Sequence, residues 1–231
     1  MFSFMQNIFG TSVSAIEKDS SGIFGIVVDR SGSMTTMHKE LINGLNTLIA
    51  DQKELVGNNT KTQVFISQFD NKVENLLKNV PLNQVPIFDE KNFIPRGMTA
   101  LLDGIYHMVQ QISEEMERKK DQNLAPPIIV IMTDGEENSS TVSHPEVLRL
   151  ITEKKTLGWK FTFMGCSANA IEIGKCMGFD KERCLNYQPN GPSQSNAWRA
   201  VSAQVSRTMS HPNDDTSAGF TDAERFSVQT S

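Results

Sequence analysis

The sequence predicts an α/β fold with three layers, in which helices cover both faces of a doubly wound, mostly parallel sheet with one antiparallel edge strand. Apolar runs that suit buried strands alternate along the chain with segments whose apolar residues recur at helical spacing. The runs at 22–29 and 128–132 are nearly continuous, which is typical of central strands buried on both faces. Because parallel strands need helical crossovers, this alternation favours a mostly parallel sheet.

Six segments are predicted to form strands: 22–29, 62–69, 72–82, 128–132, 159–164 and 183–187. We expect the segment 72–82 to form a strand that pairs beside 62–69, and one edge strand of the sheet to be antiparallel. The segment 159–164 (WKFTFM) alternates apolar and polar residues, so one of its faces is expected to be partly wet.

Five further segments are predicted to form helices: 35–55, 101–116, 144–156, 168–177 and 195–209. The first carries Met37, Leu41 and Leu45 at helical spacing, which indicates an amphipathic helix. The third follows Ser143-His144-Pro145-Glu146, which has the form of a capping box with an early proline.

The length of 231 residues suits one domain with terminal extensions. We expect an N-terminal arm at 1–20, a folded domain at 21–209 and a disordered C-terminal tail at 210–231, which is rich in Ser, Thr, Asp and Ala. The arm carries several apolar residues. It is either a short partner-binding peptide, or a segment that folds back on the domain or stays loose.

Charge and composition exclude several classes of function. The net charge is −5 and there is no basic block, which argues against nucleic-acid binding. The longest apolar run is far shorter than the roughly 20 residues of a membrane-spanning helix. The three cysteines form no CxxC pair and the N-terminus lacks the pattern of a secretory signal, so we expect a cytoplasmic protein.

Polar residues gather where the predicted strands end. Asp29, Ser31 and Ser33 follow one buried strand, Asp134 follows another, and Thr99 lies in a loop before a helix. In an open parallel sheet such ends lie at one edge, where ligands bind. Carboxylate and hydroxyl oxygens suit Mg²⁺, or Mn²⁺ and Ca²⁺, better than Zn²⁺. Since two of the five residues bring formal charge, the site is expected to keep waters and an open position that a foreign carboxylate could fill.

These motifs resemble the metal-ion-dependent adhesion site (MIDAS) of the von Willebrand factor type A (VWA) domain, a Rossmann-like fold. The resemblance rests on Asp-x-Ser-x-Ser at Asp29, Gly-x-Thr at Thr99 and Thr-Asp-Gly at Asp134, and it covers 20–209. It implies that Ser31, Ser33 and Thr99 offer hydroxyls, that the two aspartates act partly through water, and that an Asp or Glu of a partner protein completes the metal shell. The wording of the motifs is most similar to stand-alone intracellular or phage-type members, such as the tellurium-resistance-associated group.

Other charged residues lie near these motifs, and for the two glutamates and Arg30 two interpretations stay open. Glu136 and Glu137 either attract or bind a cation or form a solvated acidic turn. Arg30 either contacts a partner's acid or forms a salt bridge on the surface. Asp103 lies early in its predicted helix, where a negative charge suits the helix dipole.

The sequence therefore favours a metal-dependent protein-binding module without catalytic residues and with Mg²⁺ as its cofactor. One alternative is a structural or assembly subunit in which the metal stabilises loops. Another is a metal-dependent hydrolase of the phosphatase type, but that chemistry calls for a second Asp where the chain has Ser31, and the chain has no nucleophile-elbow or phosphate-loop motif. The partner, the preferred metal and the oligomeric state are not readable from the sequence.

Overall fold

The computed structural model describes residues 22–57, 61–134, 137–212 and 219–230. Within them the chain forms a six-stranded sheet in the order β3-β2-β1-β4-β5-β6. Its strands are β1 (Ile23–Asp29), β2 (Gln63–Phe69), β3 (Val73–Pro81), β4 (Ile128–Thr133), β5 (Lys160–Gly165) and β6 (Cys184–Asn186). All neighbouring pairs are parallel except β2 and β3. The predicted fold class is confirmed, including the antiparallel edge strand.

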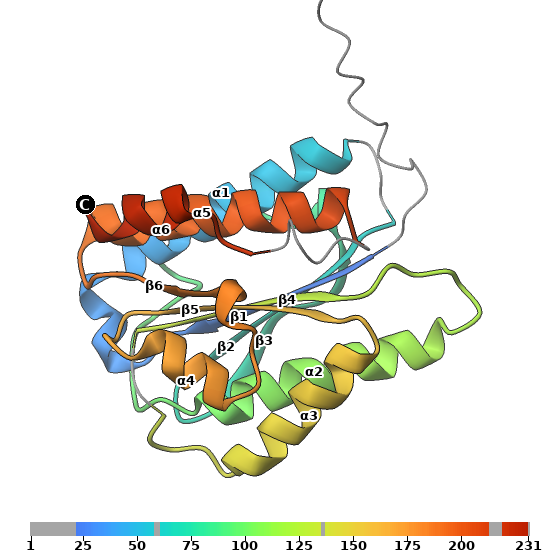
Figure 1. The fold of residues 1–231 in the computed structure, drawn as a ribbon, viewed down its shortest axis with the longest axis horizontal. Helices are drawn as coiled ribbons and strands as arrows, with labels where there is room; N and C mark the ends of the chain where they lie inside the picture. Colours follow the sequence, from blue (N-terminus) through green and yellow to red (C-terminus); the bar gives the residue numbers. More distant parts are fainter. Residues whose placement is uncertain (1–21, 58–60, 135–136, 213–218, 231) are drawn as a thin grey trace, which may run out of the picture.

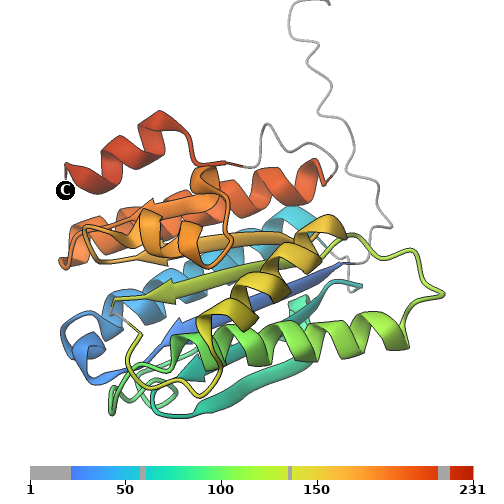
Figure 2. The ribbon, with the colours of Figure 1, turned by 60° about the horizontal axis from the view of Figure 1, so that its bottom comes forward.

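Helices cover both faces of this sheet (Figure 1). One face carries α1 (His38–Val56), α5 (Gly191–Ser210) and α6 (Asp222–Gln229), and the other carries α2 (Leu101–Arg118), α3 (His144–Thr156) and α4 (Ala170–Cys176). Figure 2 shows the strands between these two layers; all of them except β3 run in one direction, so the carboxyl ends of the parallel strands share an edge.

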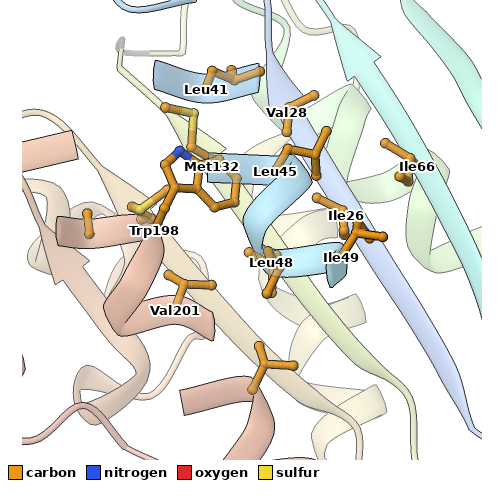
Figure 3. Close-up of a cluster of buried hydrophobic side chains, with 14 of the residues drawn as sticks. Ile26, Val28, Leu41, Leu45, Leu48, Ile49, Ile66, Met132, Trp198 and Val201 are labelled. Carbon is orange, nitrogen blue, oxygen red and sulfur yellow. The ribbon is translucent and has the colours of Figure 1, made fainter. Parts of the chain in front are cut away.

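The sheet separates two hydrophobic cores. Every residue of β1 and β4 is buried, as their continuous apolar runs predict, because side chains alternate between the two faces and both faces are covered. On the α1 and α5 face, Trp198 lies between Leu45 of α1 and Val201 of its own helix (Figure 3). Gly44 permits this packing, since a Cβ at that position would lie 2.1 Å from the Trp198 ring.

Several boundaries differ from the sequence prediction for local reasons. The first helix does not start at 35, because a 3₁₀ turn, η1 (Gly32–Thr36), precedes α1. Helix α5 begins at Gly191, earlier than predicted, since the Asn190 side chain accepts a hydrogen bond from the Ser193 N–H and caps it. The predicted capping box of α3 is present, and the Glu146 carboxylate accepts from the Ser143 N–H at 2.9 Å.

The prediction of a disordered tail is wrong for residues 219–230. Thr221 and Glu224 form a capping box at the start of α6, and Phe220 and Val228 are buried against the α5 face. Arg207 of α5 donates to both carboxylate oxygens of Glu224 at 2.7 and 2.9 Å. The few apolar residues of this segment are therefore enough to dock it, because α5 supplies the matching surface. The predicted arm at 1–20 lies outside the described residues.

No helix in the described part of the chain combines the length and apolar character needed to cross a membrane.

Candidate metal site

The predicted site residues lie where β1 and β4 end side by side. Asp29 is the last residue of β1 and Thr133 the last of β4, and the two strands pair in parallel up to Val28 and Met132. The chain leaves β1 toward α1 on one face and leaves β4 toward α3 on the other. Connections that leave toward opposite faces open a crevice at the carboxyl edge of such a sheet.

A continuous run of hydrogen bonds joins four of the five residues. The Asp29 carboxylate accepts from the Ser31 N–H at 2.6 Å. The hydroxyls of Ser31 and Ser33 lie 3.0 Å apart, and the Ser33 hydroxyl donates to the Asp134 carboxylate at 2.8 Å. These oxygens come from positions about a hundred residues apart in the chain, so the fold brings together what the motifs predicted.

Thr99 lies in the adjoining loop. The Gly32 N–H donates to the Gly97 carbonyl at 3.2 Å, which places the loop of Thr99 against the loop of the two serines. The Thr99 backbone N–H donates to the Asn138 side chain at 2.9 Å, and Thr99 itself is buried. Among the described residues, the hydrogen bonds of Thr99 run through its backbone, whereas the other four site residues are joined through their side chains.

The second carboxylate oxygen of Asp29 is bound by a residue of the sheet. This oxygen accepts from the Thr133 hydroxyl at 2.6 Å, and the Tyr187 hydroxyl donates to the Thr133 carbonyl at 3.2 Å. Asp29 is fully buried. Thr133 and Tyr187 were not predicted as site residues. Thr133 belongs to the Thr-Asp-Gly motif, but only Asp134 of that motif was predicted as a ligand, and no sequence pattern links Tyr187 to these motifs.

Burial makes both carboxylates costly to ionise. Burial raises the pKa of Asp29, although the hydrogen bonds from Thr133 and Ser31 oppose the rise. Burial also raises the pKa of Asp134 to about 6; the Ser33 hydrogen bond opposes this, and the nearby Asp29 carboxylate adds to it. Two desolvated carboxylates at one place are compensated by a cation, so the electrostatics suit a metal ion.

The donor set fits a hard divalent cation. It consists of two carboxylates and three hydroxyls, which are the oxygen ligands that Mg²⁺ and Mn²⁺ prefer. In the described part of the chain, no group of three or more His, Cys, Asp or Glu side chains gathers to hold a metal. The candidate site has two carboxylates, fewer than such a group would need, and its three neutral hydroxyls supply the other donors.

The neighbouring charged residues have structural partners. Glu137 accepts from the N–H groups of Leu102, Ser139 and Ser140 at 2.7–3.0 Å, so it caps α2 and is not a solvated acidic turn. Asp103 accepts from the N–H groups of Thr141 and Val142 at 2.8–3.1 Å as well as lying in the first turn of α2. Glu136 lies outside the described residues.

Arg30 is buried and forms ion pairs with Asp70 and Glu74, at 2.9 and 2.8 Å. The Arg30 side chain therefore binds carboxylates of its own chain, inside the protein rather than on its surface. Asp70 and Arg96 take part in the same network and were not predicted, because charged residues in turns usually indicate a solvated surface.

Comparison with known proteins identifies the class. The chain belongs to the von Willebrand factor type A domain family, whose model matches residues 25–187. Members of this family often depend on a metal at a MIDAS and mediate protein interaction, and they are mostly not enzymes. No curated protein sequence matches the chain.

Solved structures share this fold at low sequence identity. The PilB minor pilin of Streptococcus sanguinis matches with a TM-score of 0.60 and 14% identity over 87% of this chain and 65% of the pilin. The SpRpn10 VWA domain matches with a TM-score of 0.54 and 13% identity over 76% of this chain and 92% of that domain. Proximal thread matrix protein 1 of the mussel byssus, described with a zinc-occupied MIDAS motif, matches at 0.56 and 14% over 83% and 47%. The chain thus spans less than two thirds of the pilin and of the matrix protein.

Proposed function

We propose that this chain is a metal-dependent protein-binding module. Asp29, Ser31, Ser33, Thr99 and Asp134 would hold one divalent cation, and an Asp or Glu of a partner protein would complete its shell. The observation that carries this proposal is the hydrogen-bonded run from Asp29 through the two serines to Asp134 at the carboxyl edge of the sheet.

The proposed ligands differ in burial: some are enclosed by the protein, and others can be reached by a ligand of another molecule. Asp29, Ser31 and Thr99 are buried, whereas Ser33 is exposed and Asp134 is half-buried. A ligand from another molecule therefore has access from the side of Ser33 and Asp134. A bound dication supplies Lewis-acid affinity for a carboxylate oxygen. The 3₁₀ turn that begins at Gly32 brings further backbone N–H groups to this side, which favours an incoming anion.

Mg²⁺ is the proposed metal, with Mn²⁺ or Ca²⁺ as substitutes. The byssus protein carries zinc at its MIDAS, yet the oxygen-only donors of the present chain are a harder set than zinc prefers. The residues of the three motifs support a MIDAS with all five positions present, of the kind found in stand-alone, tellurium-resistance-associated members of the family. The predicted cytoplasmic location stays a prediction.

Metal titration and pull-down test the proposal. Mn²⁺ binding followed by electron paramagnetic resonance should be saturable in the native chain and absent in Asp29→Ala. Partner capture from a lysate should depend on Mg²⁺, be abolished by EDTA and be absent in the same variant. Asp103→Ala is the matched control, since it removes a carboxylate at the same edge that binds loop N–H groups instead. Equal Mn²⁺ binding by the native chain and Asp29→Ala would refute the proposed site.

The structural-subunit alternative makes a different prediction. If the metal merely stabilises loops of an assembly, the mass measured by light scattering should be that of an oligomer and should not change on chelation. A hydrolase would turn over a generic phosphate ester in a metal-dependent way, and Asp29→Asn would abolish it. We propose no catalytic residue for this chain.

A further inference from the structure

A cluster of four charged side chains lies next to the proposed metal site. Arg30, directly after Asp29, donates to Asp70 at 2.9 Å and pairs with Glu74 at 2.8 Å. Arg96, three residues before Thr99, donates to the same Asp70 oxygen at 2.8 Å and to Glu74 at 2.9 Å. The proposed function assigns no role to these four residues.

Asp70 is the centre of this cluster. One of its carboxylate oxygens accepts from both guanidinium groups, and the other accepts from the Lys72 N–H at 2.9 Å. Its backbone carbonyl accepts from the Ala100 N–H at 2.8 Å, directly after Thr99. One residue thus contacts the loop that follows β1, the turn between β2 and β3, and the loop that leads into α2.

Backbone hydrogen bonds extend the same connection. The Arg30 N–H donates to the Phe69 carbonyl at 2.9 Å, and the Arg30 carbonyl accepts from the Arg96 N–H at 2.9 Å. The side chain of Asp70 therefore binds two residues whose backbones are already bonded to each other. Those residues flank the two serine ligands on one loop and Thr99 on the other.

The cluster is balanced in charge, with two guanidinium groups and two carboxylates. In the native chain it adds no net charge to the metal site, so there we expect it to act through geometry. A variant that removes one of the four charges also changes the local electric field. Burial opposes ionisation of Asp70, yet hydrogen bonds from Arg96 and from the Lys72 N–H, with the charges of both arginines, hold its pKa below the usual range. Asp70 therefore stays ionised, and the pairing persists, across the neutral range.

We propose that Asp70 is a positioning residue of the metal site, which sets the distance between the loop of Ser31 and Ser33 and the loop of Thr99. This inference rests on the proposed function. Thr99 needs such a device, because among the described residues no side-chain hydrogen bond ties it to the other four ligands. Groups that hydrogen-bond the ligands of a metal typically change its affinity by about 10–100-fold. Asp70 binds the chain neighbours of the proposed ligands, and we expect an effect at the lower end of this scale.

The test compares two variants that each lose an ion pair. Asp70→Asn keeps the size of the side chain and removes the charge that both arginines bind. Glu224→Gln is the matched control, since it weakens the bidentate pair with Arg207 between α5 and α6, away from the site. Mn²⁺ affinity is measured by electron paramagnetic resonance, and thermal stability by circular dichroism. Amide exchange of Gly32 and Arg96 is followed in the metal-free chain.

The proposal expects Asp70→Asn to bind Mn²⁺ at least about 10-fold more weakly, and to exchange the Gly32 and Arg96 amides faster, while β1 amides keep their protection. Glu224→Gln should lose comparable stability with unchanged Mn²⁺ affinity. If both variants bind Mn²⁺ as the native chain does, Asp70 is structural and the inference is overturned. If the native chain itself binds no Mn²⁺, the proposed function fails and the metal role of Asp70 fails with it.

Arg96→Gln is measured beside Asp70→Asn, and it replaces that variant should Asp70→Asn not fold. Arg96→Gln leaves the cluster net negative, so a loss of Mn²⁺ affinity in this variant cannot come from repulsion of the cation. Arg96 is 56% exposed, so its loss leaves the interior intact and removes one of the two guanidinium groups on Asp70. A smaller but measurable loss of Mn²⁺ affinity, with faster exchange of the Gly32 amide, would support the proposal. Native affinity in Arg96→Gln would overturn it.

Discussion

Replacing Asp134 by Asn should stabilise the metal-free protein. Burial and the neighbouring Asp29 raise the pKa of Asp134 to about 6, so at pH 7.5 the folded state holds an ionised carboxylate that it disfavours. A carboxyl pKa that rises from 3.8 to about 6 corresponds to about 3 kcal/mol. Because the side chain is half-buried, solvent screening reduces this to about 1–2 kcal/mol. The asparagine oxygen can still accept the hydrogen bond from Ser33.

The pH dependence of this stabilisation has a defined sign. Between about pH 4 and 6 the folded chain binds the Asp134 proton more tightly than the unfolded chain, so this residue stabilises the native protein as the pH falls. The advantage of Asp134→Asn should therefore be largest above pH 6 and shrink toward pH 4. Calorimetry in EDTA should show a melting temperature higher by about 2–8 °C at pH 7.5.

Saturating Mg²⁺ should make the native chain more stable than Asp134→Asn, which reverses the order expected in EDTA. A metal present at a hundred times its dissociation constant stabilises the native chain by about 2.7 kcal/mol, and Asp134→Asn should gain little. Asp180→Asn, which removes an exposed carboxylate paired with Lys155, is the control and should show neither effect. An Asn variant that is no more stable than the native chain at pH 7.5 in EDTA, or an advantage that persists at pH 4.5, would refute the electrostatic reasoning.

Three further changes probe the site and its support. Thr133→Val removes the 2.6 Å hydrogen bond to the buried Asp29. The free energy of unfolding measured in urea should fall by about 1–3 kcal/mol, and Mn²⁺ should bind more weakly. Thr133→Ser keeps the hydroxyl and should retain both the stability and the Mn²⁺ affinity. Glu137→Gln should lower the free energy of unfolding by about 1 kcal/mol, because it weakens the cap of α2. The rise in melting temperature on adding Mg²⁺ should stay unchanged. Loss of that rise would place Glu137 at the metal. Gly44→Ala puts a methyl group against the Trp198 ring and should cost about 1–3 kcal/mol in urea unfolding, while an unchanged midpoint would contradict the packing seen in Figure 3.

The sheet was predictable because its central strands have strong local signals. The runs that became β1 and β4 are apolar at nearly every position, and such runs have few alternatives to a strand buried on both faces. The edge of the fold was harder to predict. Residues 219–230 carry few apolar side chains, and what makes them fold is the surface of α5, above all Arg207, which no local pattern links to Glu224.

The grouping of the candidate site residues was predictable for a related reason. Asp29, Ser31 and Ser33 stand in one short motif directly after a strand, so their order in the sequence is also their order in space. Asp70 and Arg96 belong to separate turns, and each makes its contacts with loops to which it does not belong. Their role depends on the order of β2 and β1 in the sheet, which single-sequence patterns do not specify.

This difference suggests where positioning residues should be sought in such a sheet. Of the proposed ligands, all but Thr99 lie at the ends of the two central strands, whereas Asp70 follows β2, the strand next to β1 on the other side from β4. From there it contacts Arg30 in the loop after β1 and Arg96 in the loop before α2. A buried arginine one position after the first ligand then requires such a carboxylate, since an unpaired guanidinium costs several kcal/mol inside a protein. Arg30 and Asp70 are therefore best understood as a pair, and replacing one without the other should lower the stability of the fold as well as the metal affinity.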